Sequence, residues 1–302
     1  MVIQINSINS LFDAINYFEK IINASFDTKV SIDFTNSSFV RNHYLSIIGM
    51  SIEILKTRNN DIQILKPNNQ KVLDSMNDIG FLPAFCDEKE GYDTHKTMIK
   101  YTHIPIKEYD LELQRFYVYF MQQFKGKIEN LSPLLLKKIL QKFFELFSNV
   151  FRHSESGIGF FCSGQFYPKN DKFNFTVVDN GITIRRNVNR YLLKEHKRQQ
   201  SFSDRLFSKK FQPLNGLDAI QWALIDNHST TGSGGLGLSL LLDLVTISGG
   251  NIEILSGNGY FSMREGESEI LDSSFEGTII SVELSTKKDK YYFLKEENHE
   301  NN

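Results

Sequence analysis

The first third of the chain alternates between two spacings of hydrophobic residues. One spacing repeats apolar side chains along one face of a helix, and the other alternates them with polar residues, as in a strand. Helices are expected at residues 8–24, 38–55 and 69–78, and strands at residues 29–34 and 61–66. Gly80 follows the third helix as a stop signal. Helices and strands that alternate across short connections predict an α/β domain with a parallel pair of strands.

The chain then changes character before a second domain begins. Residues 86–102 are charged and rich in turn formers, so we expect an exposed connection or a hairpin there. Residues 104–106 fit a short strand, and residues 111–124 fit a helix that leads into the second domain. The expected domains are residues 1–105 and 106–286, followed by a charged tail at residues 287–302.

A strongly apolar run starts at Pro133 and predicts a long, largely buried helix. Ser132 precedes it as an N-cap, with proline at the first helical position. Glu145, Asn149 and His153 recur every fourth residue and therefore lie on one stripe of this helix. Taken alone, a solvated polar stripe is the simpler interpretation. A carboxylate and a carboxamide buried in so apolar a helix would each require a partner.

Two later motifs carry candidate chemistry. A strand at residues 173–178 ends in Asp179-Asn180-Gly181, which places a carboxylate where α/β folds bind ligands. This sequence also fits a common turn. A glycine run at residues 232–237 precedes a helix predicted at residues 238–245. Bare backbone N–H groups before a helix N-terminus can hold an anion, although such a run can also be a plain flexible loop.

The ordered set of helix Glu-xxx-Asn, strand Asp-x-Gly and Gly-x-Gly before a helix resembles the GHKL ATP-binding fold over residues 125–284. That superfamily includes sensor histidine kinases, gyrase B, the large heat-shock chaperone, mismatch-repair ATPases and anti-sigma-factor kinases. The resemblance implies an α/β sandwich with a mixed sheet on one side and helices on the other. Its last strands are expected at residues 249–256, 259–262 and 277–284.

The same resemblance implies ATP and Mg²⁺ as cofactors and a role for each motif residue. Asn149 would be the magnesium ligand, Glu145 would take a proton from a water or hydroxyl beside the γ-phosphate, and Asp179 would accept a hydrogen bond from the adenine amine. The other expected nucleotide-binding residues are Arg152, His153, Gly181, Thr231, Gly232, Gly234, Gly235, Leu236, Gly237 and Thr278. For His153 alone, a structural role at the helix end is the simpler alternative.

The chain departs from the family pattern after Gly181. The family usually has a second glycine where this chain has Thr183, and threonine cannot replace a glycine of positive φ without strain. The region between the motifs, residues 185–233, occupies the position of the ATP lid and includes a helix predicted at residues 217–227. Its basic runs, residues 185–190 and 194–198, favour a solvated face over a surface that neutralises phosphate or docks a partner.

The first domain resembles a STAS domain, the fold of anti-sigma-factor antagonists, through the order of its elements and through residues 32–40. STAS switches carry a phosphorylatable Ser or Thr at the start of the first long helix. Residues 39–43 contain none, and Ser37 and Ser38 come too early. We therefore expect a structural or docking role for this domain.

Composition narrows the functional classes. The 302 residues include 34 basic and 36 acidic side chains, which gives no argument for nucleic acid or an anionic membrane as partner. No run approaches the length of a membrane span, and no signal peptide is expected. Cys86 and Cys162 lack metal-ligand spacing, so we expect a reduced, cytoplasmic protein.

The function expected from these features is Mg²⁺-dependent ATP binding, with hydrolysis or protein phosphorylation in trans that regulates a protein partner. An autophosphorylating kinase is not expected, because His95 and His103 lie in turn-like sequence. The alternative is a non-catalytic interaction scaffold, which Thr183 favours and which Glu145 and Asn149 argue against. A homodimer is an arrangement that the sequence leaves open.

Overall fold

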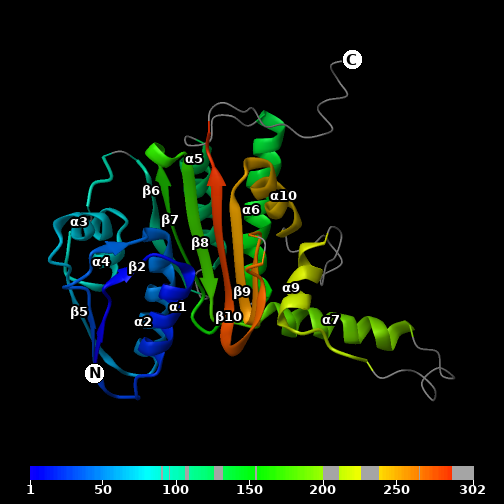
Figure 1. The fold of residues 1–302 in the computed structure, drawn as a ribbon, viewed down its shortest axis with the longest axis horizontal. Coiled ribbons are helices and arrows are strands. Elements are labelled where there is room, and N and C mark those ends of the chain that lie inside the picture. The colour runs from blue at the N-terminus through cyan, green and yellow to red at the C-terminus, as the bar shows by residue number, and fades with distance from the viewer. Residues whose placement is uncertain are drawn as a thin grey trace. The chain divides into compact units, whose positions relative to one another are not determined.

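The computed structural model of the protein describes residues 1–89, 91–94, 96–105, 109–125, 132–153, 155–199, 211–225, 238–264 and 266–287 (Figure 1). The chain is an α/β protein with both parallel and antiparallel strand pairs. It divides into two compact units. Among the described residues, the first unit takes in those within 1–130, 158–179 and 281–290, and the second those within 131–157 and 180–280. The expected boundary between residues 105 and 106 stays a prediction.

The first unit contains most of the strands. Its elements are β1 (Val2–Gln4), β2 (Ser7–Ile8), α1 (Leu11–Ile22), β3 (Lys29–Asp33), β4 (Phe39–Val40), η1 (Asn42–Tyr44), α2 (Leu45–Thr57), β5 (Asp61–Leu65), α3 (Gln70–Asp78), α4 (Phe81–Phe85), β6 (Met98–Ile104), α5 (Tyr109–Lys125), β7 (Phe160–Tyr167), η3 (Pro168–Asn170) and β8 (Lys172–Asp179).

The second unit is mostly helical. Its elements are α6 (Pro133–His153), α7 (Ile184–Gln199), α9 (Gly216–Leu224), α10 (Leu238–Ser248), β9 (Asn251–Ser262) and β10 (Glu269–Ser285), of which residues 281–285 belong to the first unit. Within this unit α10 packs against α6 and β9, and α9 packs against α7 and β9.

The predicted parallel pair of strands is confirmed and gains a third member. Strands β1, β3 and β5 form a parallel sheet in which Ile3 lies opposite Ile32, and Ile32 opposite Ile64. Ile3 and Ile32 are buried, as alternation along a half-covered strand requires. Gly80 ends the third helix region with φ 83°, a conformation that glycine adopts without a steric cost.

Several element boundaries differ from those expected. The helix expected at residues 8–24 begins at Leu11, because Ser10 and Asp13 form a capping box and residues 7–8 pair with β4 instead. In the helix expected at residues 38–55, residues 39–40 instead form strand β4. The helical part begins as the 3₁₀ turn η1 at Asn42. The strand expected at residues 104–106 shares only residue 104 with β6, which starts at Met98, inside the segment expected to be a connection or a hairpin.

The larger sheet has the strand order β6-β7-β8-β10-β9. Strands β6, β7 and β8 pair antiparallel. In the first unit, α5 covers one face of these strands with phenylalanines, since the ring of Phe120 lies 5.6 Å from that of Phe175, and the ring of Phe116 lies 6.1 Å from that of Phe160. Strand β7, a continuous buried run, was not among the predicted strands.

The opposite face of β7 carries polar side chains and contacts the N-terminal elements of the same unit. The Ser163 hydroxyl accepts from the backbone N–H of Ser46 at 3.1 Å and donates to the carbonyl of His43 at 2.9 Å. The Asn42 carboxamide donates to Gln165 Oε1 at 3.0 Å. These bonds join η1 and α2 to β7, so the N-terminal elements and this part of the sheet form one packed body.

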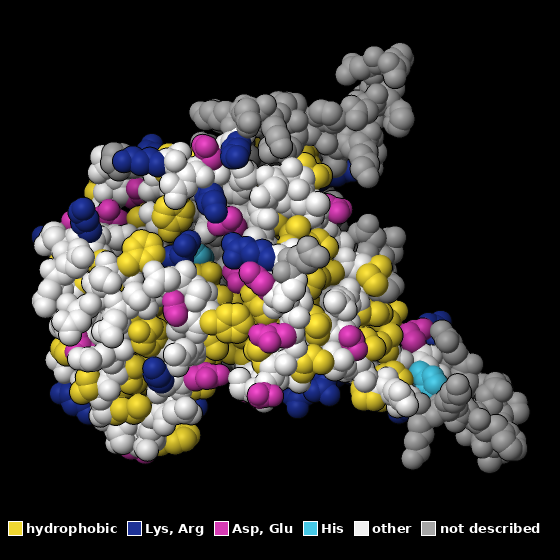
Figure 2. Space-filling model, in the orientation of Figure 1, with side chains coloured by type: hydrophobic (Ala, Val, Ile, Leu, Met, Phe, Trp, Pro, Cys, Tyr) yellow, Lys and Arg dark blue, Asp and Glu magenta, His cyan; other side chains and the backbone are white. Residues whose placement is uncertain are grey.

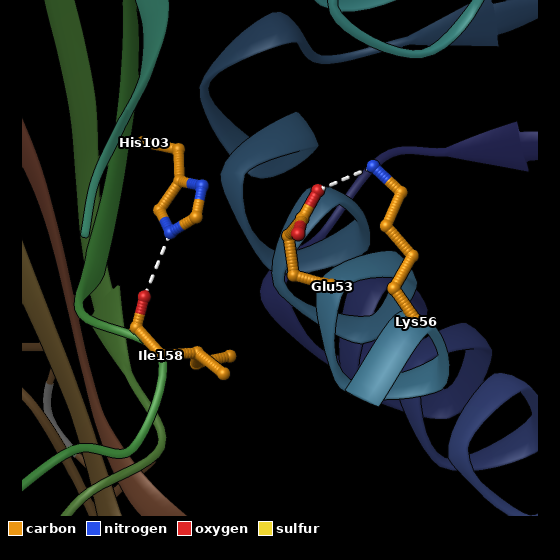
Figure 3. Close-up of polar contacts among 4 residues, drawn as sticks. All are labelled: Glu53, Lys56, His103 and Ile158. Atoms are coloured by element: carbon orange, nitrogen blue, oxygen red, sulfur yellow. Dashed lines mark hydrogen bonds and ion pairs between the residues drawn. The ribbon is translucent and has the colours of Figure 1, made fainter. Parts of the chain in front are cut away.

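His103 lies in strand β6 and not in a turn, contrary to expectation. Its Nε2 lies 2.7 Å from the carbonyl oxygen of Ile158, and its ring stacks on Phe161 at 4.2 Å (Figure 3). The same view shows Glu53 and Lys56 on α2, which form an ion pair of 2.7 Å with each other. His103 therefore anchors the backbone that precedes β7, which explains a histidine here without a phosphoacceptor role.

In the second unit, the predicted start of α6 is confirmed. The Ser132 hydroxyl accepts from the N–H of Leu135 at 3.0 Å, and the first turn begins at Pro133. The buried face of α6 repeats at helical spacing through Leu135, Ile139, Phe143 and Phe147. The helix expected at residues 217–227 is also present, but it runs from Gly216 to Leu224.

The strands of this unit are longer than expected. Residues 251–262 form one strand, β9, where two strands and a turn were expected. Within this strand Gly257 adopts φ 61°, a conformation that glycine tolerates and that often marks an irregularity inside a continuous strand. Strand β10 begins at Glu269, well before the expected start at residue 277.

Charged side chains are spread widely over the surface. On the face shown in Figure 2, acidic and basic side chains lie interspersed among hydrophobic ones. This agrees with the near balance of 34 basic and 36 acidic residues. Among the helices that the structure describes, none combines the length and the hydrophobicity that crossing a bilayer requires.

Candidate functional site

Asp179 is the last residue of strand β8, as predicted. It lies opposite Phe160 of β7 in the antiparallel register, and it is only 2% exposed. A carboxylate this deeply buried is costly unless polar groups compensate it. A simple surface turn of Asp-Asn-Gly would leave the carboxylate in water and involve no such cost.

The turn that follows strand β8 belongs to the second unit and is held by a side-chain hydrogen bond. The hydroxyl of Ser156 donates to Asn180 Oδ1 at 2.5 Å. Beside Ser156, Glu155 accepts from Arg190 of α7 at 2.8 Å, and this hydrogen bond lowers the pKa of the Glu155 carboxyl. The loop after α6 is thus tied both to this turn and to helix α7.

Thr183 is the N-cap of helix α7. Its hydroxyl accepts from the N–H of Arg186 at 3.2 Å, and its carbonyl accepts from the N–H of Asn187 at 3.0 Å. Among the described residues of positive φ, Thr183 is absent. Thr183 stands where the family has its second glycine, but the expected backbone strain is not found. Helix α7 starts directly after Thr183, and threonine is favoured as an N-cap residue.

A buried hydroxyl network joins the start of α7 to strands β9 and β10. Ser256 Oγ accepts from the N–H of Ile184 at 2.8 Å and donates to the carbonyl of Gly277 at 3.0 Å. It also lies 2.8 Å from Thr278 Oγ1. Because Ser256 already donates its single hydroxyl proton to Gly277, the Thr278 hydroxyl must be the donor to Ser256. The Ile184 N–H, the Gly277 carbonyl and the Thr278 hydroxyl thus each have a partner. Thr278, a predicted site residue, is therefore part of the network that holds the start of α7.

The same part of the second unit contains a polar cavity of about 310 Å³. Gly181 and Thr183 line it together with Arg185 and Arg186 of α7, Asn258 of β9 and Glu276 of β10. The basic residues of α7 are otherwise exposed, as the interpretation of a solvated face predicts. The sequence-based prediction included Gly181 as a site residue. It interpreted the basic run with Arg185 and Arg186 as a solvated face, and it missed Asn258 and Glu276.

The predicted residues of the long helix all lie in α6: Glu145, Asn149, Arg152 and His153. The helical backbone preserves their four-residue spacing. Their side chains lie outside the described residues. Gln141, which extends the stripe towards the N-terminus, is exposed. The helix on which the prediction depends is therefore confirmed, and the roles of its side chains stay predictions.

The predicted glycine-rich segment also lies outside the described residues. It comprises Thr231, Gly232, Gly234, Gly235, Leu236 and Gly237. Helix α10 begins at Leu238, directly after it, where a helix was predicted.

Ser256 is a site residue that sequence reasoning missed. It stands in a Ser-Gly-Asn-Gly stretch at residues 256–259, where Ser256 was expected to end one strand and Gly259 to begin the next after a turn at residues 257–258. The available signal was that a strand interrupted by glycine often contains a bulge beside a close backbone approach. Gly259 indeed approaches Gly216, since a Cβ added at Gly216 would lie 2.4 Å from the Gly259 nitrogen.

Comparison with known proteins does not assign a family to this chain. No protein-family model matches it, and no curated protein matches it.

Proposed function

We propose that the protein binds ATP with Mg²⁺ in the manner of the GHKL superfamily and hydrolyses it or transfers its phosphoryl group to a protein. The observation that carries the proposal is the buried carboxylate of Asp179 at the end of β8. Adenine presents an exocyclic amine, and a carboxylate is a pure acceptor that pairs with such a donor.

The order of the elements supports the same proposal. Helix α6 carries the Glu-xxx-Asn motif, β8 ends at Asp179, and α10 begins directly after the glycine-rich segment. Three motifs on the expected kinds of element, in the expected order, are harder to obtain by chance than any one of them.

In this proposal each residue has a distinct task. Asn149 holds Mg²⁺ through its amide oxygen, which is the ligand type that magnesium prefers. Glu145 takes the proton of the attacking water or hydroxyl. Residues 231–237 hold the phosphates through backbone N–H groups at the start of α10. Held by Asn149, the magnesium ion would supply positive charge that offsets the negative charge of the phosphates.

In this proposal the N-terminal elements serve in regulation of a protein partner. The N-terminal elements, in their STAS-like order, dock a protein partner whose state follows the bound nucleotide. A cytoplasmic location fits the reduced cysteines, since Cys86 and Cys162 are both free thiols. If the wild type binds ATP without turnover, the interaction scaffold becomes the better description.

The test compares ATP with inosine triphosphate, which has an oxo group in place of the exocyclic amine. Wild-type protein is expected to prefer ATP, because the buried hydrogen bond to Asp179 would be worth about 1–3 kcal/mol, or roughly 5- to 150-fold in affinity. Asp179→Asn removes the pure acceptor and is expected to abolish the preference. Equilibrium binding of both nucleotides to both proteins measures it.

Asp171→Asn is the matched control. Asp171 precedes the same strand at its other end and adopts φ 49°, which asparagine tolerates. This variant is expected to keep the preference for ATP. An Asp179→Asn protein that is folded by circular dichroism and still prefers ATP to the same extent contradicts the adenine contact.

A further inference from the structure

The polar cavity beside the first turn of α7 offers charges of both signs to one small space. Arg185 and Arg186 line it from α7, and Glu276 lines it from β10. These side chains form no ion pair with one another within the described part of the chain. Opposite charges that share a cavity without contact are complementary to a ligand that carries both charges.

The guanidinium groups of Arg185 and Arg186 have N–H donors that no described residue uses. The Arg186 side chain makes no hydrogen bond or ion pair with any described residue, and Arg185 uses only its Nε, which donates to the Leu214 carbonyl at 3.2 Å. The neighbouring carboxylate Glu155 has its hydrogen bond from Arg190. Two guanidinium groups on one helical turn are therefore left to face an anion, for which their fork of N–H donors is well suited.

The anionic side is also unpaired. Glu276 makes no hydrogen bond or ion pair with any described residue, and it is exposed on β10 beside Ser274, which also lines the cavity. Its carboxylate can accept from an ammonium group. The cavity thus has an anion-binding wall and a cation-binding wall.

The backbone around the cavity is held by hydrogen bonds. The Asn189 carboxamide donates to the Leu214 carbonyl at 2.9 Å and accepts from the Leu214 N–H at 2.8 Å, so it clamps the chain before α9 against α7. Ser256 and Thr183 hold the first turn of α7 by the bonds described above. The backbone is therefore already ordered, and binding costs mainly the conformational entropy of the arginine and glutamate side chains.

We propose that this cavity binds a small zwitterion with a phosphate or carboxylate group, held by Arg185 and Arg186, and an ammonium group, held by Glu276. Its volume of about 310 Å³ suits a compact metabolite and is small for a nucleoside triphosphate. Asp179 does not line the cavity, so the proposal does not depend on the adenine contact, although Gly181, an expected nucleotide-binding residue, lines it.

Calorimetric titration of the full chain with phosphoethanolamine, β-alanine and inorganic phosphate tests the proposal. Phosphoethanolamine or β-alanine is expected to bind, and whichever binds more tightly identifies the anionic group. Arg186→Gln is expected to weaken that binding about tenfold or more, as loss of a charged hydrogen bond does. Glu276→Gln is expected to reduce phosphoethanolamine binding to the level of inorganic phosphate, which lacks the amine.

Arg198→Gln is the matched control, because Arg198 is an exposed arginine at the other end of α7. It is expected to leave binding unchanged. The proposal is overturned if neither zwitterion binds the wild type at millimolar concentration. It is also overturned if Arg186→Gln and Arg198→Gln weaken binding equally.

Discussion

At the scale of single residues, Tyr101 shows a buried polar group that the fold does not satisfy. Its ring packs among aromatic side chains, with the rings of Phe81 and Phe85 each 5.5 Å away. Its hydroxyl is buried and has no hydrogen-bond partner among the described residues. This burial raises the pKa of the Tyr101 hydroxyl well above its ordinary value. Gly49 allows the close approach, since a Cβ there would lie 2.3 Å from that hydroxyl.

Replacing Tyr101 by phenylalanine is expected to stabilise the protein. The change removes a hydroxyl that lost its hydrogen bonds to water on folding, and such a group costs about 1–3 kcal/mol. Urea denaturation measures the free energy of unfolding. Tyr119→Phe is the matched control, because the Tyr119 hydroxyl accepts from the N–H of Lys100 at 2.9 Å. The control is expected to be destabilised, and a Tyr101→Phe protein that is equally destabilised contradicts the account.

Residue-scale predictions from the sequence were best where chemistry was local. Asp179 lies at the end of a strand, as its sequence context predicted, and the structure adds that it is buried. Thr183 was interpreted against a family glycine, although its hydroxyl was a sufficient signal for an N-cap. Ser256 was missed because its three hydrogen-bond partners are distant in the sequence.

At the scale of elements, local signals located most helices and failed at some of their ends. The Ser132-Pro133 pair predicted the start of α6 correctly. The start of α1 was predicted too early, because residues 7–8 pair with β4 and the sequence does not show that pairing. The strand β6 was shortened in the prediction because its charged surroundings resemble a connection.

The cap of α7 gives a direct test at this scale. Thr183→Ala removes the acceptor for the Arg186 N–H and is expected to cost about 1 kcal/mol. Thr183→Ser keeps the hydroxyl and is expected to cost much less. Hydrogen exchange of the amides at residues 184–187 follows the first turn itself. Equal exchange rates in the alanine and serine variants would mean that Thr183 does not act as the cap.

At the scale of the whole molecule, the sequence predicted the α/β class and not the long-range pairings. The five-stranded order β6-β7-β8-β10-β9 joins strands far apart in the chain. The bonds from Asn42 to Gln165 and from Ser46 to Ser163 span more than a third of the chain. Such contacts depend on the packing of complete elements, so neither periodicity nor spacing reveals them.

Acid is expected to destabilise the protein through His43. This side chain is 1% exposed, and burial, assisted by Arg41, lowers its pKa to about 3. Below its ordinary pKa of about 6.5, the unfolded chain binds a proton that the native protein does not. As the pH falls from about 6.5 towards 3, His43 therefore lowers the free energy of unfolding by about 1.4 kcal/mol per pH unit.

Urea denaturation of wild type and His43→Gln over this pH range measures the contribution. All other groups titrate alike in the two proteins, so the difference in slope isolates His43. The wild type is expected to lose stability more steeply than the variant on acidification. Parallel curves would show that the imidazole is protonated in the native protein or accessible to water.

The central claim is that this fold binds ATP together with Mg²⁺. Calorimetric titration of the folded protein with ATP, in the presence and in the absence of Mg²⁺, tests it most directly. Saturable binding that strengthens when Mg²⁺ is present is expected, because Asn149 would hold the metal and its charge would offset that of the phosphates. A folded protein that binds no ATP under either condition contradicts it.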